Sequence, residues 1–504
     1  MAFYRGFVLD DAYIIYRYSK HLIEGHGLTW NVGEKPVEGY TSFLWVVANI
    51  LPLSIKADPA IFSKVVSAAS ALLAAFLIVR TAGRNGPGLA IALGAAICAS
   101  PAYAFVSSFG METSITVTLL CLVSYLSWRS LESPSKKMFL WLWAAAFFSM
   151  LSRPDSAGYV AGAALGILLV LSYRKDRDAI WNMALTSVPF FILGVIYMAW
   201  RLSYFGHLLP NTFNVKVGGT GFMNTMIKAY ITGFITHAAL PYAGLFAIIF
   251  YRYRGRELFM LSLPGTLGAG VFAFYLLNII PVQGLLWRFI YPAYLPFILT
   301  TALVAGNGKK EGGPLVSSRL GAALLALFFI GWNLHILPQT LEAREMRTSE
   351  DRVLAGKALR GLPGIMFVSE SGALPYFSEW KSEDPLGLTS YEIATQGLDK
   401  EHLAEWAPDL VMTVAINYVV PEKVSDNAPR SLKDVVAQNN YMAENGFVVV
   451  CAIKKHGNYR HFYFADTDSS LFDEIVKRLT EIEAVEYADL NAIYEEPRMP
   501  VYGN

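Results

Sequence analysis

Apolar residues run through the first two thirds of this 504-residue chain in long stretches, which polar residues separate into about ten segments. A helix needs about 20 apolar residues to cross the hydrocarbon core of a bilayer, so segments of this length predict membrane-spanning helices. They lie at 61–80, 88–107, 111–129, 138–152, 156–173, 179–200, 228–250, 257–279, 285–305 and 318–337. The apolar run 42–55 is too short to cross, and we interpret it as an interfacial helix.

The last third of the chain has a different pattern. Short apolar runs of strand length alternate with helix-like stretches, which predicts a small α/β domain outside the membrane. The strands are expected at 364–368, 409–414 and 446–453, and the helices at 349–360, 398–406 and 469–482. The predicted fold is therefore mostly α, with a polytopic membrane helix bundle at 1–337 followed by an extracytoplasmic α/β domain at 338–504.

Composition agrees with this pattern. The chain is 54% hydrophobic and only 16% charged, with a mean hydropathy of +0.39, which indicates an integral membrane protein surrounded by lipid. A net charge of +1 gives no basic field of the kind that attracts nucleic acid, so we exclude nucleic acid as a partner. The three cysteines show neither a disulfide framework nor a metal-binding spacing.

Lysine and arginine occur in alternate loops, and such loops face the cytoplasm. The basic loops contain Arg80, Arg84, Arg129, Lys136, Lys137, Arg174, Lys175, Arg177, Arg252, Arg254, Arg256, Lys309, Lys310 and Arg319. The loops between them carry few cations and most of the unusual polar residues. The alternation predicts a multi-pass protein of the cytoplasmic membrane, with Asp10, Asp11 and the C-terminal domain on the extracytoplasmic side.

Asp10 and Asp11 begin a stretch with helical spacing, and two carboxylates beside a membrane bundle are costly unless transport or chemistry needs them. One face of that helix would carry Asp10, Ile14, Arg17 and His21. The pair could cap the helix, because exposed backbone N–H groups and the helix dipole favour acids there. Alternatively, one carboxylate accepts a proton from an acceptor hydroxyl while the other orients it or holds a cation. No His or Cys spacing accompanies the pair, so a metal site is not indicated.

Further acids and cations lie near the predicted outer boundaries. Glu38 and Glu112 are lone acids that suit either an ordinary hydrogen-bonding role or a ligand contact. Arg153 and Asp155 are expected to lie near each other at the rim of the bundle, as a structural or a functional ion pair. We take all four as candidates for contacting a bound ligand.

The loop 204–216 and the segment around Arg288 offer groups that recognise anions. Lys216 could bind a phosphate as a point charge, Asn211 could hydrogen-bond a sugar or phosphate oxygen, and His207 is expected to be packed. Arg288 lies inside an apolar run near its outer end, where a guanidinium needs an anion, and we favour a lipid phosphate. The segment SESGALPYFS is expected to form a turn after a strand, without a catalytic role.

These elements form an ordered set that resembles the bacterial GT-C glycosyltransferases, most closely the group containing the mycobacterial cell-wall terminal β-arabinofuranosyltransferase. The set spans Asp10 to Leu388. In order, it comprises LDDAYIIYRYSKHLIEGHGLTWNVGEKPVEGYTSFLW, FGMETS, SRPDS, YFGHLLPNTFNVK, WRFIYP, SESGALPYFS and DPLGL.

The resemblance implies an enzyme that transfers a sugar, with a pentofuranose such as arabinofuranose favoured, from a polyprenyl-monophosphate donor to a hydroxyl of an envelope glycan or glycoconjugate. It places the catalytic base at Asp10, with Asp11 as its partner. Arg17, Lys216 and Arg288 then take the positions of donor-phosphate ligands. An anionic leaving group needs cations and a weakly acidic hydroxyl needs a carboxylate, so no cofactor is required; a divalent metal is compatible with this chemistry but not indicated.

In the family a membrane helix precedes the acidic pair, whereas here Asp10 follows Met1 after only a few residues. We therefore expect an upstream helix to be missing from the sequence as given. Two non-enzymatic alternatives stay open: a flippase or transporter of lipid-linked sugars, and a scaffold for envelope assembly. Transport is disfavoured because the polar residues gather at outer loops rather than at the midpoints of spans.

Overall fold

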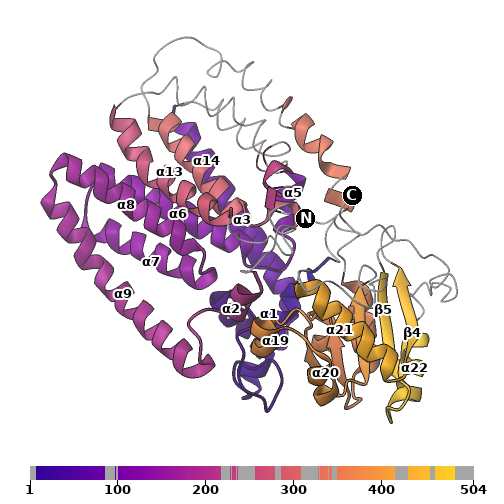
Figure 1. Cartoon of the computed structure of the whole chain (residues 1–504). Coiled ribbons are helices and arrows are strands. Elements are labelled where there is room, and N and C mark those ends of the chain that lie inside the picture. Colours follow the sequence, from indigo (N-terminus) through magenta and orange to yellow (C-terminus); the bar gives the residue numbers. More distant parts are fainter. Residues whose placement is uncertain are drawn as a thin grey trace.

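The computed structural model describes residues 7–85, 97, 100–216, 227–228, 230–233, 235, 256–277, 285–307, 327–328, 330–338, 340–342, 349–414, 430–454 and 460–482. A bundle of long helices occupies one side of the molecule and an α/β domain the other (Figure 1). Two short helices, α1 (Asp10–Ile23) and α2 (Phe43–Ser54), lie between them. The predicted fold class is confirmed.

Five described helices are long and apolar enough to cross a membrane, and each coincides with a predicted span. They are α3 (Pro59–Ala82), α6 (Thr113–Glu132), α8 (Ser156–Arg174), α9 (Arg177–Phe205) and α13 (Arg256–Leu276). A sixth predicted segment forms the 17-residue helix α7 (Lys136–Ser152). The predicted spans 88–107 and 228–250 lie mostly outside the described residues, although the short helix α5 (Pro101–Val106) falls in the first of them. Half of the predicted span 318–337 is described, at 327–328 and 330–337, and it is mostly helical.

The predicted span 285–305 begins later than expected. A 3-10 turn occupies Leu285–Trp287, and the helix α14 runs from Tyr291 to Asn307. Pro292 stands at the start of this helix, where a proline is tolerated because its missing N–H would have no partner there. Arg288 therefore lies in a turn that precedes the helix and not within the helix itself.

Helix α2 has the 12 residues expected of the short apolar run, and Ser42 caps its start by accepting a hydrogen bond from the Trp45 backbone N–H. At 1.5 Å per residue this helix is much too short to cross a bilayer. Its interfacial location stays a prediction.

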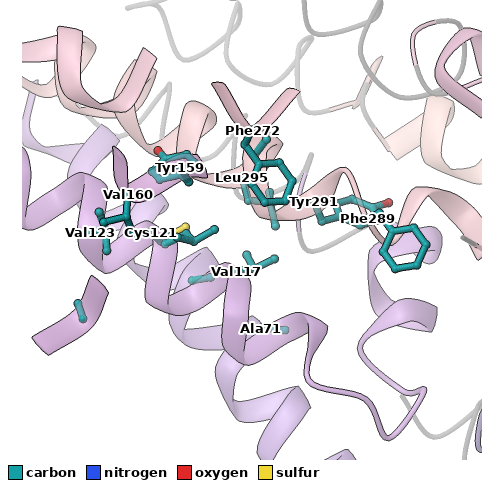
Figure 2. Close-up of a cluster of buried hydrophobic side chains, with 14 of the residues drawn as sticks. Ala71, Val117, Cys121, Val123, Tyr159, Val160, Phe272, Phe289, Tyr291 and Leu295 are labelled. Carbon is teal, nitrogen blue, oxygen red and sulfur yellow. The ribbon is translucent and has the colours of Figure 1, made fainter. Parts of the chain in front are cut away.

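Helices α6, α8, α13 and α14 pack around a common apolar core, which includes Val117, Cys121, Tyr159, Phe272 and Leu295 (Figure 2). Small residues allow α8 and α13 to approach closely, as is typical of membrane helices. A Cβ atom on Gly162 would lie 2.5 Å from the backbone oxygen of Leu267, and one on Gly166 would lie 2.6 Å from the Cα of Pro264.

Replacing Gly166 with alanine should therefore destabilise the bundle by about 1–3 kcal/mol, because the added methyl group meets backbone that cannot rotate away. Gly158→Ala on the same helix is the matched control, since its Cβ would meet only the Val271 side chain at an ordinary 3.7 Å. Thermal unfolding of the purified protein in detergent micelles measures both variants. Equal melting temperatures for the two would contradict the close packing.

The C-terminal domain, from α17 (Glu350–Leu359) onward, contains one five-stranded sheet in the order β2-β1-β3-β5-β4. Its strands are β1 (Ile365–Val368), β2 (Lys381–Glu383), β3 (Leu410–Val414), β4 (Phe447–Lys454) and β5 (Arg460–Asp466). The strands β2, β1 and β3 run parallel, and β5 pairs antiparallel with both β3 and β4.

The predicted strands correspond to β1, β3 and β4, and the predicted helices to α17, α20 (Lys400–Trp406) and α22 (Phe472–Thr480). Sequence patterns missed β2, β5, α18 (Ala373–Ser378), α19 (Tyr391–Gln396) and α21 (Arg430–Glu444). The boundary at residues 337 and 338 stays a prediction, because 343–348 are outside the described part of the chain.

The strands bury alternate residues on opposite faces of the sheet, as a period of two requires. Met366 and Val368 pack with α17 and α22, whereas Phe367 packs on the other face with α20 and α21. The domain is therefore a three-layer α/β/α unit whose parallel strand β1 ends next to α1.

One ion pair should make the stability of this domain depend on pH. His402 Nε2 lies 2.7 Å from Glu383 Oε2, and the hydrogen bond to that carboxylate raises the pKa of His402. Because the folded-state pKa is the higher one, the stabilisation is fully present below the unfolded pKa of about 6.5 and is lost as the pH rises through the folded value.

We expect the melting temperature to fall as the pH rises above about 6.5, and His402→Gln to remove that component. Melting curves of the whole protein between about pH 5.5 and 9 provide the measurement. His26→Gln, at an exposed histidine outside this domain, is the control and should keep the wild-type profile. An unaltered pH profile in His402→Gln would refute the role of this pair.

Candidate active site

The polar residues singled out from the sequence gather at one end of the bundle, next to the C-terminal domain. Glu112 immediately precedes α6, Arg153 follows α7, and Asp155 precedes α8. Helix α1 begins at Asp10, and the turn that carries Arg288 contacts it. The basic residues at the helix ends, such as Arg129 and Arg256, lie at the opposite ends of their helices.

Asp10 is 5% exposed and is held by the C-terminal domain. The backbone N–H of Gly372 donates to its Oδ2 at 2.7 Å, and that of Ala373 donates to its Oδ1 at 3.0 Å. Arg352 Nε lies 3.0 Å from the same Oδ1. The N-cap of α1 is Leu9, and neither aspartate caps the helix with its side chain, but both lie in the first turn, where the helix dipole favours acids.

Asp11 has a different environment. Its side chain is 25% exposed, and its Oδ2 accepts a hydrogen bond of 3.1 Å from Arg288 Nη2. Arg288 itself is buried, and its Nε and Nη1 have no hydrogen-bond partner among the residues that the structure describes. Buried donors without partners cost free energy unless a ligand satisfies them, so this guanidinium can bind an anion.

A second charged group also contacts Phe289. Arg153 pairs with Glu112 at 3.0 Å and with Asp155 at 2.6 Å, which confirms that Arg153 and Asp155 are neighbours. The guanidinium carbons of Arg153 and Arg288 lie 5.0 and 4.8 Å from the centre of the Phe289 ring. Glu112 is 2% exposed, and no described residue forms a hydrogen bond with its Oε2, so an unpaired acceptor accompanies the unpaired donors of Arg288.

Two predicted ligand-binding residues instead connect the two parts of the molecule. Arg17 donates hydrogen bonds to the backbone oxygens of Trp30, Pro375 and Trp380 and to Asn31 Oδ1. All three nitrogens of its guanidinium therefore have partners within the protein. We therefore correct its expected role as a phosphate ligand to a structural one.

Asn211 has a similar structural role. Its side-chain amide donates to the backbone oxygens of Gly387, Leu388 and Ser390, so it holds the loop of the DPLGL motif. Asp384 in that motif accepts hydrogen bonds from Leu386 and Leu388, and burial raises its pKa to about 7. The expected contact of Asn211 with a sugar or phosphate is thus replaced by contacts within the protein.

Glu38 pairs with Arg201, a residue that the sequence analysis missed; Arg201 Nε lies 3.1 Å from Glu38 Oε2. Burial raises the pKa of Glu38 to about 6, although Arg201 opposes this shift.

His207 stacks on Tyr391 with 3.7 Å between the ring centres, which confirms that it is packed. Lys216 ends helix α10 (Asn211–Lys216), and its side chain is outside the described structure.

The residues around Asp10 that sequence reasoning missed all belong to the C-terminal domain. Arg352 comes from α17, Gly372 and Ala373 follow β1, and His461 comes from β5. The one available signal was the segment SESGALPYFS, whose glycine sits where a Cβ would lie 1.9 Å from the Asp10 backbone oxygen.

Among the described residues, no group of three or more His, Cys, Asp or Glu side chains is arranged to hold a metal ion. The expectation that no metal is required stays a prediction.

The chain matches no protein-family model. Among solved structures, it is similar to ArnT from Cupriavidus metallidurans in the apo state, with a TM-score of 0.55 and 13% identity over 91% of this chain and 94% of that chain. The same protein bound to undecaprenyl phosphate gives a TM-score of 0.57 and 12% identity over 92% and 95%. The chain therefore has the fold of ArnT, and its five apolar helices indicate a multi-pass membrane protein; this agrees with the predicted resemblance to GT-C glycosyltransferases.

Within that class the chain resembles the terminal β-(1→2)-arabinofuranosyltransferases, as the sequence motifs predicted. It is 29% identical over 232 residues to the enzyme of Mycobacterium tuberculosis, and this match covers 42% of this chain and 35% of that protein. It is 28% identical over 249 residues to the enzyme of Corynebacterium glutamicum, which covers 43% and 35%. The matched part thus spans only about a third of the length of these relatives.

Proposed function

We propose that this protein is a membrane glycosyltransferase that takes a sugar from a polyprenyl-monophosphate donor and transfers it to a hydroxyl of an envelope glycan or glycoconjugate. The observation that carries the proposal is the buried guanidinium of Arg288, whose Nε and Nη1 lack partners while its Nη2 contacts Asp11. It supports a site for an anion next to a carboxylate. The similarity to arabinofuranosyltransferases, and to a fold whose known example binds undecaprenyl phosphate, supports the choice of donor.

The chemistry requires a base and a cation in the same place. The acceptor hydroxyl oxygen attacks the anomeric carbon, its proton passes to a carboxylate, and the bond from that carbon to the phosphate oxygen breaks. The polyprenyl phosphate leaves with the bonding electron pair, and a guanidinium stabilises the negative charge that develops on it. Asp11 and Arg288 would provide these two groups.

The geometry favours Asp11 over Asp10 as the base. Both oxygens of Asp10 accept backbone N–H groups, and Arg352 contacts it as well, so a substrate hydroxyl has little room to approach. The partly exposed carboxylate of Asp11 has one described partner, Arg288. We therefore transfer the role of base, which the family resemblance implied for Asp10, to Asp11.

The unpaired Oε2 of Glu112 is suited to accept a hydrogen bond from a sugar hydroxyl of the donor. Arg153 and Asp155 would hold Glu112 in place, because Arg153 bridges the two carboxylates. We propose an arabinofuranose as the sugar, because both matched relatives are named as arabinofuranosyltransferases.

We also propose that the site faces the extracytoplasmic side of the cytoplasmic membrane. The candidate residues lie at the ends of α6, α7 and α8 that are opposite to the ends rich in lysine and arginine. Basic loops face the cytoplasm, which supports an outer location for the site and the C-terminal domain.

The test is to incubate membranes containing the protein with radiolabelled polyprenyl-phosphate arabinofuranose and, in parallel, with labelled hexose donors. We expect label to move from the lipid fraction into glycan, with the pentose donor preferred, and not to move in membranes that lack the protein. Label that crosses the membrane while still attached to lipid would indicate a flippase. Label that neither moves to glycan nor crosses would reject both activities.

A further inference from the structure

A network of charged side chains crosses the C-terminal domain and ends on Asp10. His461 Nδ1 lies 2.6 Å from Asp351 Oδ2, and its Nε2 lies 3.1 Å from Arg352 Nη1. Arg352 also contacts Glu370, and its Nε lies 3.0 Å from Asp10 Oδ1. The donor-binding groups proposed above do not include any of these C-terminal residues.

The two cationic members of this network are deeply buried, since Arg352 is 2% and His461 0% exposed; Asp10 and Asp351 are 5% exposed, and the side chain of Glu370 is 10% exposed. Burying a guanidinium has a large desolvation cost, and well-packed apolar residues often stabilise a protein as well as a buried ion pair does. Stability alone therefore gives a weak reason for keeping such a group of charges. Fixing the orientation of one particular carboxylate gives a stronger one.

The backbone around Asp10 is held by the same domain. Ser349 Oγ donates a hydrogen bond of 2.9 Å to the backbone oxygen of Val8, just before the acidic pair. Gly372 approaches the Asp10 backbone so closely that a Cβ would lie 1.9 Å from its oxygen. The side chain of Asp10 and the backbone on both sides of Leu9 thus have fixed positions relative to β1 and α17.

We propose that Arg352 is a positioning residue: through Asp10, the C-terminal domain sets the start of α1 so that Asp11 faces Arg288. The Asp351–His461 pair orients the Arg352 guanidinium, and Glu370 balances its charge. This inference depends on the proposed function only for its kinetic consequence, because the position of Asp11 can be measured without any transfer reaction.

The experiment compares Arg352→Gln, Arg352→Lys and His461→Gln in the full-length protein, normalised to the folded, monodisperse fraction. Arg352→Gln should lower kcat roughly 10-fold to 100-fold, the loss that a small displacement of a reacting group produces. The affinity for undecaprenyl phosphate alone should change by no more than about twofold, since Arg288 is intact. Arg352→Lys should recover part of kcat because it restores the charge.

The matched control is Arg360→Gln. Arg360 ends the same helix, is exposed, and pairs with Glu379 on the surface, so its replacement should leave kcat and affinity unchanged. If Arg352→Gln folds poorly, His461→Gln tests the same network of charged side chains, one contact further from Asp10. Folded variants of Arg352 and His461 that retain the wild-type kcat would overturn the proposal and leave this cluster with a structural role.

A second measurement separates this inference from the proposed function. Asp11→Cys provides a labelling site at a partly exposed position, since the Asp11 side chain is 25% exposed, whereas the described native cysteines Cys121 and Cys451 are buried. Its rate of labelling by a membrane-impermeant maleimide should rise several-fold when Arg352→Gln is added, because the start of α1 is then released. A wild-type protein inactive with every donor would reject the proposed function, whereas an unchanged labelling rate would reject the positioning role.

Discussion

Asparagine at position 11 is expected to lower the kcat of sugar transfer by roughly 10²-fold to 10⁴-fold, the contribution typical of a general base. The side chain keeps its size and can still accept a hydrogen bond from Arg288, so the protein should insert and fold. Transfer of label from a polyprenyl-phosphate sugar, measured per folded molecule, gives the loss. Donor affinity should change much less than kcat.

Asp10→Asn is the matched control, because it is the same substitution one residue earlier. Asp10 accepts two backbone N–H groups and contacts Arg352, and removing one partner of a buried ion pair costs about 3–5 kcal/mol. Its melting temperature should therefore fall, which Asp11→Asn should not show, and its kcat should fall no further than that of Arg352→Gln, because only the positioning of Asp11 is lost. A stable, inactive Asp10→Asn beside an active Asp11→Asn would return the base to Asp10.

Replacing Arg288 with glutamine should weaken binding of undecaprenyl phosphate by roughly 10-fold to 100-fold, which corresponds to about 1.4–2.8 kcal/mol. The guanidinium is 4% exposed and offers Nε and Nη1 without protein partners, so a phosphate would complete its hydrogen bonds. Charge-assisted hydrogen bonds of this kind are among the stronger ones in proteins. Titration of the purified protein with undecaprenyl phosphate measures the effect.

Arg256→Gln is the control for that experiment. Arg256 begins α13 at the opposite end of the bundle and is exposed, apart from a contact of its guanidinium with the Tyr173 ring. The substitution Arg256→Gln removes the same charge as Arg288→Gln but lies away from the candidate site. Equal loss of affinity in both variants would mean that Arg288 acts through general electrostatics and does not bind the phosphate directly.

The bundle was predictable because its signal is local. Long apolar stretches place helices such as α8 and α9 wherever about 20 residues can cross a bilayer, whatever the rest of the chain does. The strands β1, β3 and β4 followed from short continuous apolar runs of strand length. The strand β2 was missed because it has only three residues, too few to show a period.

Part of the candidate site was predictable in the same way. Arg153 and Asp155 are two residues apart, so their ion pair follows from their spacing. Arg288 was recognisable as a candidate because it is a cation within an apolar run. The roles of Arg17 and Asn211 were predicted wrongly, because their partners are carbonyl groups of the C-terminal domain that no motif identifies. Glu38 likewise gave no sign of its pairing with Arg201.

The sequence by itself determined the membrane bundle, the α/β class of the C-terminal domain and the polar residues at one end of the helices, since hydrophobic period and length act over neighbouring residues. Only the tertiary structure decided which carboxylate of the acidic pair is engaged and which is available. Arg288 meets Asp11 across 277 residues of chain, and Gly372 meets Asp10 across 362. Contacts at such separations depend on how the two parts pack together, and the pattern of one segment carries no information about that packing.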